Sequence, residues 1–297
     1  MKKVFRIIFA LAVAAAALSA CKKENLKSEA VQAGIPVQFV AEQIATKTEF
    51  GTPDGSTIPV LWQSGDKIKA LCQPTGVEAA NADVEVTPSA DGKTGTFTGT
   101  LAENFPYNFY ALSPSSAFIS ATYNKSYKDY IQYAIPTSQT PKDGNIDPAA
   151  VVLLAQTETL TEAPEDVVKL SFEHLSAYGK VSLKNLDTGG HTINSISLDF
   201  GEVGVAGRFI YEEQDKNNHI NVNSQAYSIT LNTSETEDIL FGIGAADISG
   251  ASLTVIVGVD NGTYVKTLTV PDGKVFKEGV ISSFSIDMTG ADRKSVV

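Results

Sequence analysis

Apolar residues recur at every second position along several stretches of the chain. Near the beginning, Val37, Phe39 and Ala41 occupy such positions, and the same pattern returns further along. The later sets are Ile68, Ala70 and Cys72; Val181 and Leu183; Tyr227, Ile229 and Leu231; Leu253, Val255, Val257 and Val259; and Val280, Phe284, Ile286 and Met288. A period of two is typical of a strand with one buried face, so the pattern predicts β-strands over these stretches.

Turn-forming residues separate the predicted strands. Asn261-Gly262 predicts a two-residue hairpin, because both residue types tolerate positive φ, and Pro271-Asp272-Gly273-Lys274 predicts the next turn. Helical signals are few. Residues 148–155 fit either a short helix capped by Asp147 or a buried strand, and both alternatives stay open. Short strands with frequent turns indicate an all-β body.

We expect this body to contain two tandem β-sandwich domains. The 297 residues of the chain exceed the roughly 250 residues at which a single core usually stops growing. The polar, proline-containing stretch 161–166 is the expected boundary. It divides an N-terminal domain, residues 36–165, from a C-terminal domain, residues 166–290, which a polar tail at 291–297 follows.

The N-terminus has the three parts of a secretory signal. A basic start is followed by an apolar run at residues 7–18 that is too short to span a bilayer, and small residues precede Cys21. Leu18-Ser19-Ala20-Cys21 resembles the bacterial lipobox, which predicts a signal peptide at 1–20, lipidation of Cys21 and a polar tether at 21–35. The alternative is an ordinary signal peptide with a coincidental cysteine. The second cysteine, Cys72, fits a small buried residue on a strand.

The negative net charge of the chain limits the classes of partner that we expect. It carries 34 acidic and 23 basic side chains, a formal net charge of -11, and loss of residues 1–20 would remove three further positive charges. Nucleic acid is therefore not an expected partner, because neutralising phosphates requires a basic surface.

Residue patterns for metal binding or catalysis are missing from the sequence. His174, His191 and His219 lie at no metal-ligand spacing from one another or from a cysteine. Asp143, Asn145 and Asp147 imitate the start of a calcium loop, but the glycine and the final glutamate of such a loop are replaced. We expect no metal, no cofactor and no enzymatic activity.

One cluster of aromatic residues stands out. Six of the ten tyrosines lie within a short stretch, at Tyr107, Tyr110, Tyr123, Tyr127, Tyr130 and Tyr133. Tyrosine can stack on sugars or form an adhesive surface, but the simpler explanation is that these rings pack on strand faces. We favour the packing interpretation.

Three stretches of the body carry recognisable motifs. Ala45-Thr46-Lys47-Thr48, followed by Leu61-Trp62-Gln63-Ser64-Gly65-Asp66-Lys67-Ile68, matches a pattern T-R/K-T … W-x-x-G-D-x-I after Phe39-Val40. Phe172–Val181 matches the start of a second domain, and Gly279–Phe284 matches a terminal strand. In this order, behind a lipobox, the motifs resemble the fimbrillin family of type V pili, including its Mfa-like and minor-subunit branches.

The resemblance implies a fold and a mode of assembly. Members of the family have transthyretin-like, Greek-key sandwiches and are exported as lipoproteins. A trypsin-like protease then removes the N-terminal strand, and the vacated groove accepts a strand from the neighbouring subunit. By resemblance, Val37, Phe39 and Ala41 lie on the displaced strand. The candidate donor strand follows Gly279 and carries Val280, Phe284, Ile286 and Met288.

The resemblance also implies a place and partners for the protein. We expect a structural or adhesive subunit of a surface fimbria, held in the outer membrane by its lipid and bound to other fimbrial subunits. The processing site of the family is usually an arginine, whereas Lys47 occupies the matching position here. A subunit left uncleaved would keep its lipid as an anchor or terminal subunit. The alternative function is a solitary surface lipoprotein that binds glycans or host ligands.

Overall fold

The computed structural model describes residues 35–42, 61–72, 80–101, 103, 105–122, 130–142, 144–212 and 220–295. In this part of the chain strands dominate, and the helical elements are two 3₁₀ turns at Ser115–Ala117 and Pro148–Ala150. The expected all-β fold is confirmed. None of these residues belongs to a helix long and apolar enough to cross a membrane. The predicted signal peptide, Cys21, the tether and Lys47 lie outside the described residues.

The first sheet contains β1 in its interior. Its eight strands are, in spatial order, β3 (Ala80–Glu85), β2 (Lys67–Cys72), β6 (Phe109–Ser113), β10 (Leu153–Gln156), β11 (Val168–His174), β1 (Ile35–Glu42), β5 (Thr94–Leu101) and β4 (Thr87–Pro88). One face of this sheet encloses a core that includes Phe39, Trp62, Phe97 and Phe109. Cys72 is buried in the same core and unpaired, as expected for a small apolar residue on a strand.

A second sheet packs on the other face of the central strands. It consists of β15 (Ile220–Ala226), β14 (Ala206–Glu212), β8 (Tyr130–Ile135) and β7 (Phe118–Thr122). A core that includes Tyr110, Leu112, Tyr133 and Phe209 joins side chains of the two sheets. Strands β6 and β10 are therefore covered on both faces, which explains why almost all their residues are buried.

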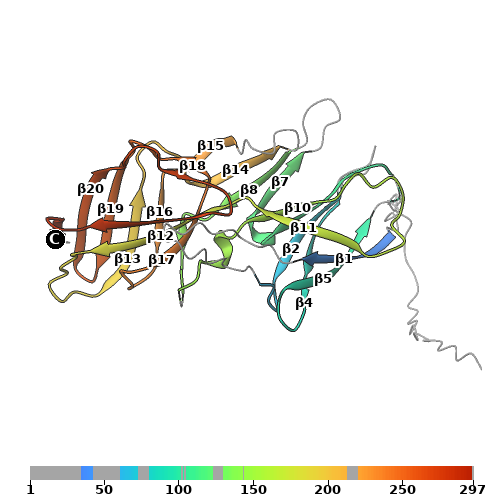
Figure 1. Cartoon of the computed structure of the whole chain (residues 1–297), viewed down its shortest axis with the longest axis horizontal. Coiled ribbons are helices and arrows are strands. Elements are labelled where there is room, and N and C mark those ends of the chain that lie inside the picture. The colour runs from blue at the N-terminus through green and yellow to red at the C-terminus, as the bar shows by residue number, and fades with distance from the viewer. Residues whose placement is uncertain are drawn as a thin grey trace, which may run out of the picture. The chain divides into compact units, whose positions relative to one another are not determined.

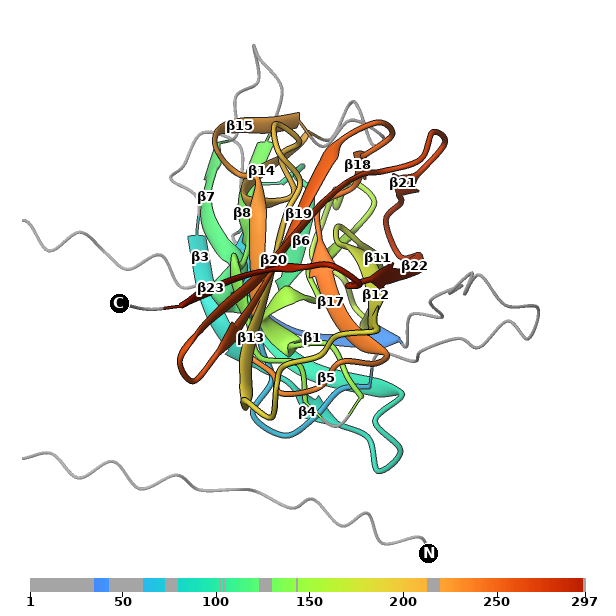
Figure 2. The same cartoon turned by 90° about the vertical axis from the view of Figure 1, so that its left-hand side faces the viewer.

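The C-terminal strands form two facing sheets and a short ribbon (Figure 2). One sheet has the order β17 (Ile239–Ile243), β12 (Ala177–Lys184), β22 (Ile281–Asp287). The other has the order β23 (Asp292–Ser295), β20 (Gly262–Thr269), β19 (Ser252–Val259), β13 (Ile193–Asp199), β16 (Ser228–Leu231), β9 (Ser138–Gln139). The ribbon pairs β18 (Ala246–Asp247) with β21 (Val275–Phe276). Their inward-facing side chains form one large apolar core.

The structure resolves two local predictions, one at residues 148–155 and one at the hairpin after β19. Residues 148–155 contain both proposed elements, a 3₁₀ turn in which Asp147 accepts from the Ala149 N–H at 2.9 Å and then strand β10. The hairpin between β19 and β20 exists, but its turn residues are Asp260 and Asn261. Gly262 instead opens β20 with φ 157°, and a side chain there would meet the Lys294 carbonyl.

The division of the body at residue 165 stays a prediction. Strand β11 follows that residue and pairs with β1 and β10. The dipeptide strand β9 precedes it and pairs with β16, and β8 pairs with β14. Residues 292–295 of the predicted polar tail form edge strand β23, which pairs with β20.

Candidate functional site

Strand β1 is paired along both of its edges. It runs antiparallel to β5 from Ile35 to Glu42 and parallel to β11 from Phe39 to Glu42. Figure 1 shows it, in blue, between these two strands. Because neighbouring strands are held by main-chain hydrogen bonds, β1 is the element that connects β5 and β4 to β11 within the sheet.

The predicted displaced-strand residues all point into the core. Val37, Phe39 and Ala41 are at most 5% exposed, whereas Gln38 between them is exposed. The Phe39 ring stacks between two others, with centroid distances of 5.0 Å to Phe97 and 4.3 Å to Phe109. Burial of a phenylalanine contributes about 1.5–3 kcal/mol, and stacked aromatic pairs add to this. Phe39 is therefore the main apolar anchor of β1.

Glycines in β5 make room for side chains of this core, including Phe39. Gly99 pairs with Val37, and a Cβ atom at Gly99 would lie 2.9 Å from Cε2 of Phe39. Gly95 pairs with Ala41, and a Cβ there would clash with a methyl group of Val86. Strand β5 was not among the strands predicted from the period of two. Its signal is the alternation of threonine with small and apolar residues over 94–101.

A single covalent link joins β1 to the strands that follow it. Residues 43–60 link β1 to the next described segment, which begins at Leu61. One cut in this link would leave β1 attached by non-covalent contacts only. Loss of β1 would then expose the apolar core around Phe97 and Phe109 and leave the inner edges of β5 and β11 unpaired. Such a groove has the properties of a strand-addition site, where main-chain bonds give affinity and side-chain pockets give register.

The predicted donor residues lie elsewhere, in the C-terminal sandwich. Strand β22 pairs in parallel with β12 and forms the end of its sheet. Ile286 and Met288 are buried in the core there, while Val280 and Phe284 are half-buried. The fold therefore does not bring the donor candidates next to β1 within one chain.

The described tyrosines of the aromatic cluster serve mainly as core residues. Tyr107, Tyr110 and Tyr133 are buried, and Tyr130 is partly buried. Tyr107 stacks on Phe105 at 5.0 Å, and Tyr133 stacks on Phe209 at 5.6 Å. The packing interpretation is confirmed for the three buried rings, which present no face to a ligand. Tyr123 and Tyr127 lie outside the described residues.

A buried histidine with a shifted pKa lies at the end of β11. The Nδ1 atom of His174 is 2.5 Å from the Tyr178 hydroxyl, and its Nε2 atom has no partner among the described residues. Burial lowers the pKa of His174 from 6.5 to about 4, because the charged ring would lose its hydration. The described residues contain no group of three or more His, Cys, Asp or Glu side chains arranged to hold a metal ion.

The lowered pKa of His174 predicts that the stability of the protein depends on pH. Its folded-state pKa lies below its unfolded value, so the unfolded chain binds more protons between pH 6.5 and about 4. We expect the free energy of unfolding to fall as the pH drops through this window, by up to about 3 kcal/mol from this group. Urea unfolding at pH 7, 5.5 and 4.5 measures the slope. His174→Gln should flatten it, and an equal slope in both proteins would contradict the assignment.

Comparison with known proteins gives structural likenesses only. No family model and no curated protein matches the chain. A protein with a proposed role in cell adhesion from Bacteroides uniformis is 14% identical, with 88% of this chain and 96% of that chain covered and a TM-score of 0.47. One of the same description from Bacteroides ovatus is 13% identical, with 89% and 97% covered and a TM-score of 0.47. A fimbrial assembly protein from Parabacteroides distasonis is 13% identical, with 88% and 94% covered and a TM-score of 0.39. These TM-scores are below 0.5, and the function is inferred below from β1 and its surroundings.

Proposed function

We propose that this chain is a structural or adhesive, non-enzymatic subunit of a cell-surface fimbria of the type V pilus kind. It is exported as a lipoprotein acylated at Cys21, and it assembles when β1 is exchanged for a strand of a neighbouring subunit. The observation that carries the proposal is the position of β1, which is central in its sheet and buried at Phe39 yet joined to the body by one link.

The driving force of this assembly is the empty groove. A chain without β1 would expose apolar side chains and two unpaired strand edges, both of which favour association with another chain. A donor strand would need apolar residues at alternate positions to refill the space left by Val37, Phe39 and Ala41. It would also need to leave its own sheet or extend beyond it.

The segment after Gly279 meets the first requirement. Phe284, Ile286 and Met288 stand at alternate positions and would insert into the groove of the next subunit. Release of β22 would cost the burial of Ile286 and Met288 in the C-terminal core and the pairing with β12. Binding in the neighbour's groove has to offset that cost, so exchange would be favoured only once β1 has left.

Proteolysis near Lys47 is the proposed trigger. Protein purified from the cell surface should therefore start near Thr48 in polymers and at Cys21 in uncleaved subunits, which N-terminal sequencing and mass spectrometry of the lipid distinguish. We expect polymers to run as SDS-resistant ladders, and Lys47→Gln to leave monomers that start at Cys21. Lys67→Gln, at an exposed lysine of β2, is the control that should keep the ladders. Monomers in every sample would argue against polymerisation.

A further inference from the structure

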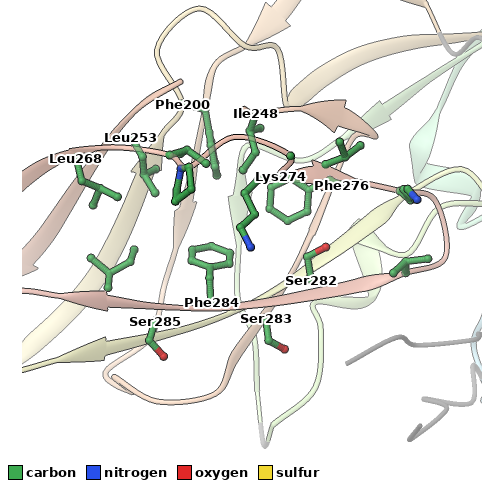
Figure 3. Close-up of a pocket in the computed structure, with 17 residues that line it drawn as sticks. Phe200, Ile248, Leu253, Leu268, Lys274, Phe276, Ser282, Ser283, Phe284 and Ser285 are labelled. Carbon is green, nitrogen blue, oxygen red and sulfur yellow. The ribbon is translucent and has the colours of Figure 1, made fainter. Parts of the chain in front are cut away.

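A cavity of about 630 Å³ opens in the C-terminal sandwich, away from β1. It lies beside β22, between that strand, the ends of β19 and β20, and the segment that contains β21 (Figure 3). Its apolar walls include Leu253, Leu268, Val270, Phe276, Phe284 and Ile286. A volume of this size is within the range of about 300–1,000 Å³ that small-molecule sites occupy.

Aromatic rings form the floor of the cavity. Phe276 and Phe284 meet edge to face at 6.4 Å, and both contact Phe241 in the same manner, at 6.3 Å and 6.2 Å. Phe241 and Phe276 are buried, whereas Phe284 is half-buried. Each ring is held in place by contacts with the other two, so the apolar wall exists without a ligand. A preformed wall lowers the entropic cost of binding.

The charged side chains that line the cavity are all positive. Lys274 and Lys277 line it, and no aspartate or glutamate does. Figure 3 shows the Lys274 side chain reaching inward toward Phe284 and Ser282, while Ser283 and Ser285 point away. The Lys274 ammonium group forms no ion pair with a described residue. An uncommitted cation beside an apolar wall is notable in a chain with a net charge of -11.

From this arrangement we infer that the cavity binds a small amphipathic carboxylate, of the medium-chain fatty-acid class. The alkyl chain lies against Leu253, Leu268 and Phe284, where it is removed from water. The carboxylate accepts a hydrogen bond from the Lys274 ammonium group and a second from the Ser282 hydroxyl. The apolar walls supply affinity and the lysine selects an anion over a neutral molecule of the same length.

Isothermal titration of the full mature chain with octanoate and with 1-octanol tests this inference. Octanoate should bind, and 1-octanol should bind at least about tenfold more weakly because it cannot form the charge-assisted bond. Lys274→Gln should weaken octanoate by a similar factor without affecting 1-octanol. The control Lys294→Gln removes the same charge from β23, outside the cavity, and should leave both affinities unchanged.

The location of binding needs a second measurement. Amide chemical-shift changes on adding octanoate should concentrate at residues 274–277 and 280–286, and Phe284→Ser should reduce them even if Lys274→Gln perturbs the local fold. Absence of octanoate binding would overturn the inference. Equal affinities for octanoate and 1-octanol, or equal effects of Lys274→Gln and Lys294→Gln, would overturn it as well. The titrations use the uncleaved chain of residues 21–297, in which β1 and β22 both stay in their own sheets, so their outcomes do not depend on strand exchange.

Discussion

Phe39→Ala is expected to destabilise the N-terminal core by about 3–5 kcal/mol, the cost of truncating a fully buried phenylalanine. The ring is 0% exposed and stacks between Phe97 and Phe109, which are themselves buried. The chain contains a single tryptophan, Trp62, and it is buried in this same core. Its fluorescence during urea unfolding therefore measures the effect locally.

A control lies next to Phe39 on the same strand. Gln38 is exposed, so Gln38→Ala keeps the main-chain bonds of β1 and should change the free energy of unfolding by no more than about 0.5 kcal/mol. If Phe39→Ala and Gln38→Ala shifted the Trp62 transition equally, Phe39 would not be the anchor of β1. The proposal that a donor must refill its position would then lose its basis.

Gly179→Ala should disrupt the C-terminal sandwich. Gly179 pairs directly with Phe241 across β12 and β17, and a Cβ atom at Gly179 would clash with the ring of that phenylalanine. Phe241 is 0% exposed and is held by Phe276 and Phe284, so it has little room to move. Overpacking of this kind typically costs about 1–3 kcal/mol, and we expect the upper end here.

A double mutant separates this clash from other effects of the substitution. Phe241→Leu removes the ring edge that the new methyl group would meet. Gly179→Ala should therefore cost at least about 1 kcal/mol less in the Phe241→Leu background than alone, as expected for residues in contact. Thermal unfolding followed by circular dichroism measures the four proteins. Strict additivity would show that Phe241 is not the reason for the glycine.

Gly179 also shows what sequence motifs can and cannot reveal. It belongs to the Phe172–Val181 motif, but the motif does not say why a glycine stands there. The reason is the Phe241 ring on β17, a strand far away in the sequence. The glycines opposite β1 are similar, because Gly99 is explained by Phe39 and Gly95 by Val86 and Trp62. These glycines are explained by packing against side chains from strands that are distant in the sequence. A local sequence motif carries no information about such packing.

Strands with one buried face were predictable from their period of two. Strands β1, β19 and β22 were found in this way, because the core covers one face and the other face is less buried. Strand β12 was found from Val181 and Leu183, although most residues of both its faces are buried. Strands β6 and β10 show almost no alternation, since a core lies on each of their faces. The pairing partners of β1 could not be inferred either. Its parallel neighbour β11 comes much later in the chain, and nothing within residues 35–42 specifies it.

The candidate site was predicted in part. The alternation of Val37, Phe39 and Ala41 indicated a strand with one apolar face, and all three residues point into the core. The role of that strand came from the family resemblance, and strand exchange stays a proposal. The cavity beside β22 had no sequence signal, because its walls come from β19, β20, β22 and the segment around β21.

Replacement of β1 by a separate peptide is the most direct test of the proposed assembly. A chain that starts at Thr48 would be refolded alone, with the peptide Ile35–Glu42, and with the same peptide carrying Phe39→Ser. The account predicts that the first peptide restores the buried Trp62 emission and an SDS-resistant complex, and that the substituted peptide does not. If the chain alone gave the same Trp62 emission and unfolding midpoint as the full chain, or if the Ile35–Glu42 peptide failed to bind, β1 would not be an exchangeable strand.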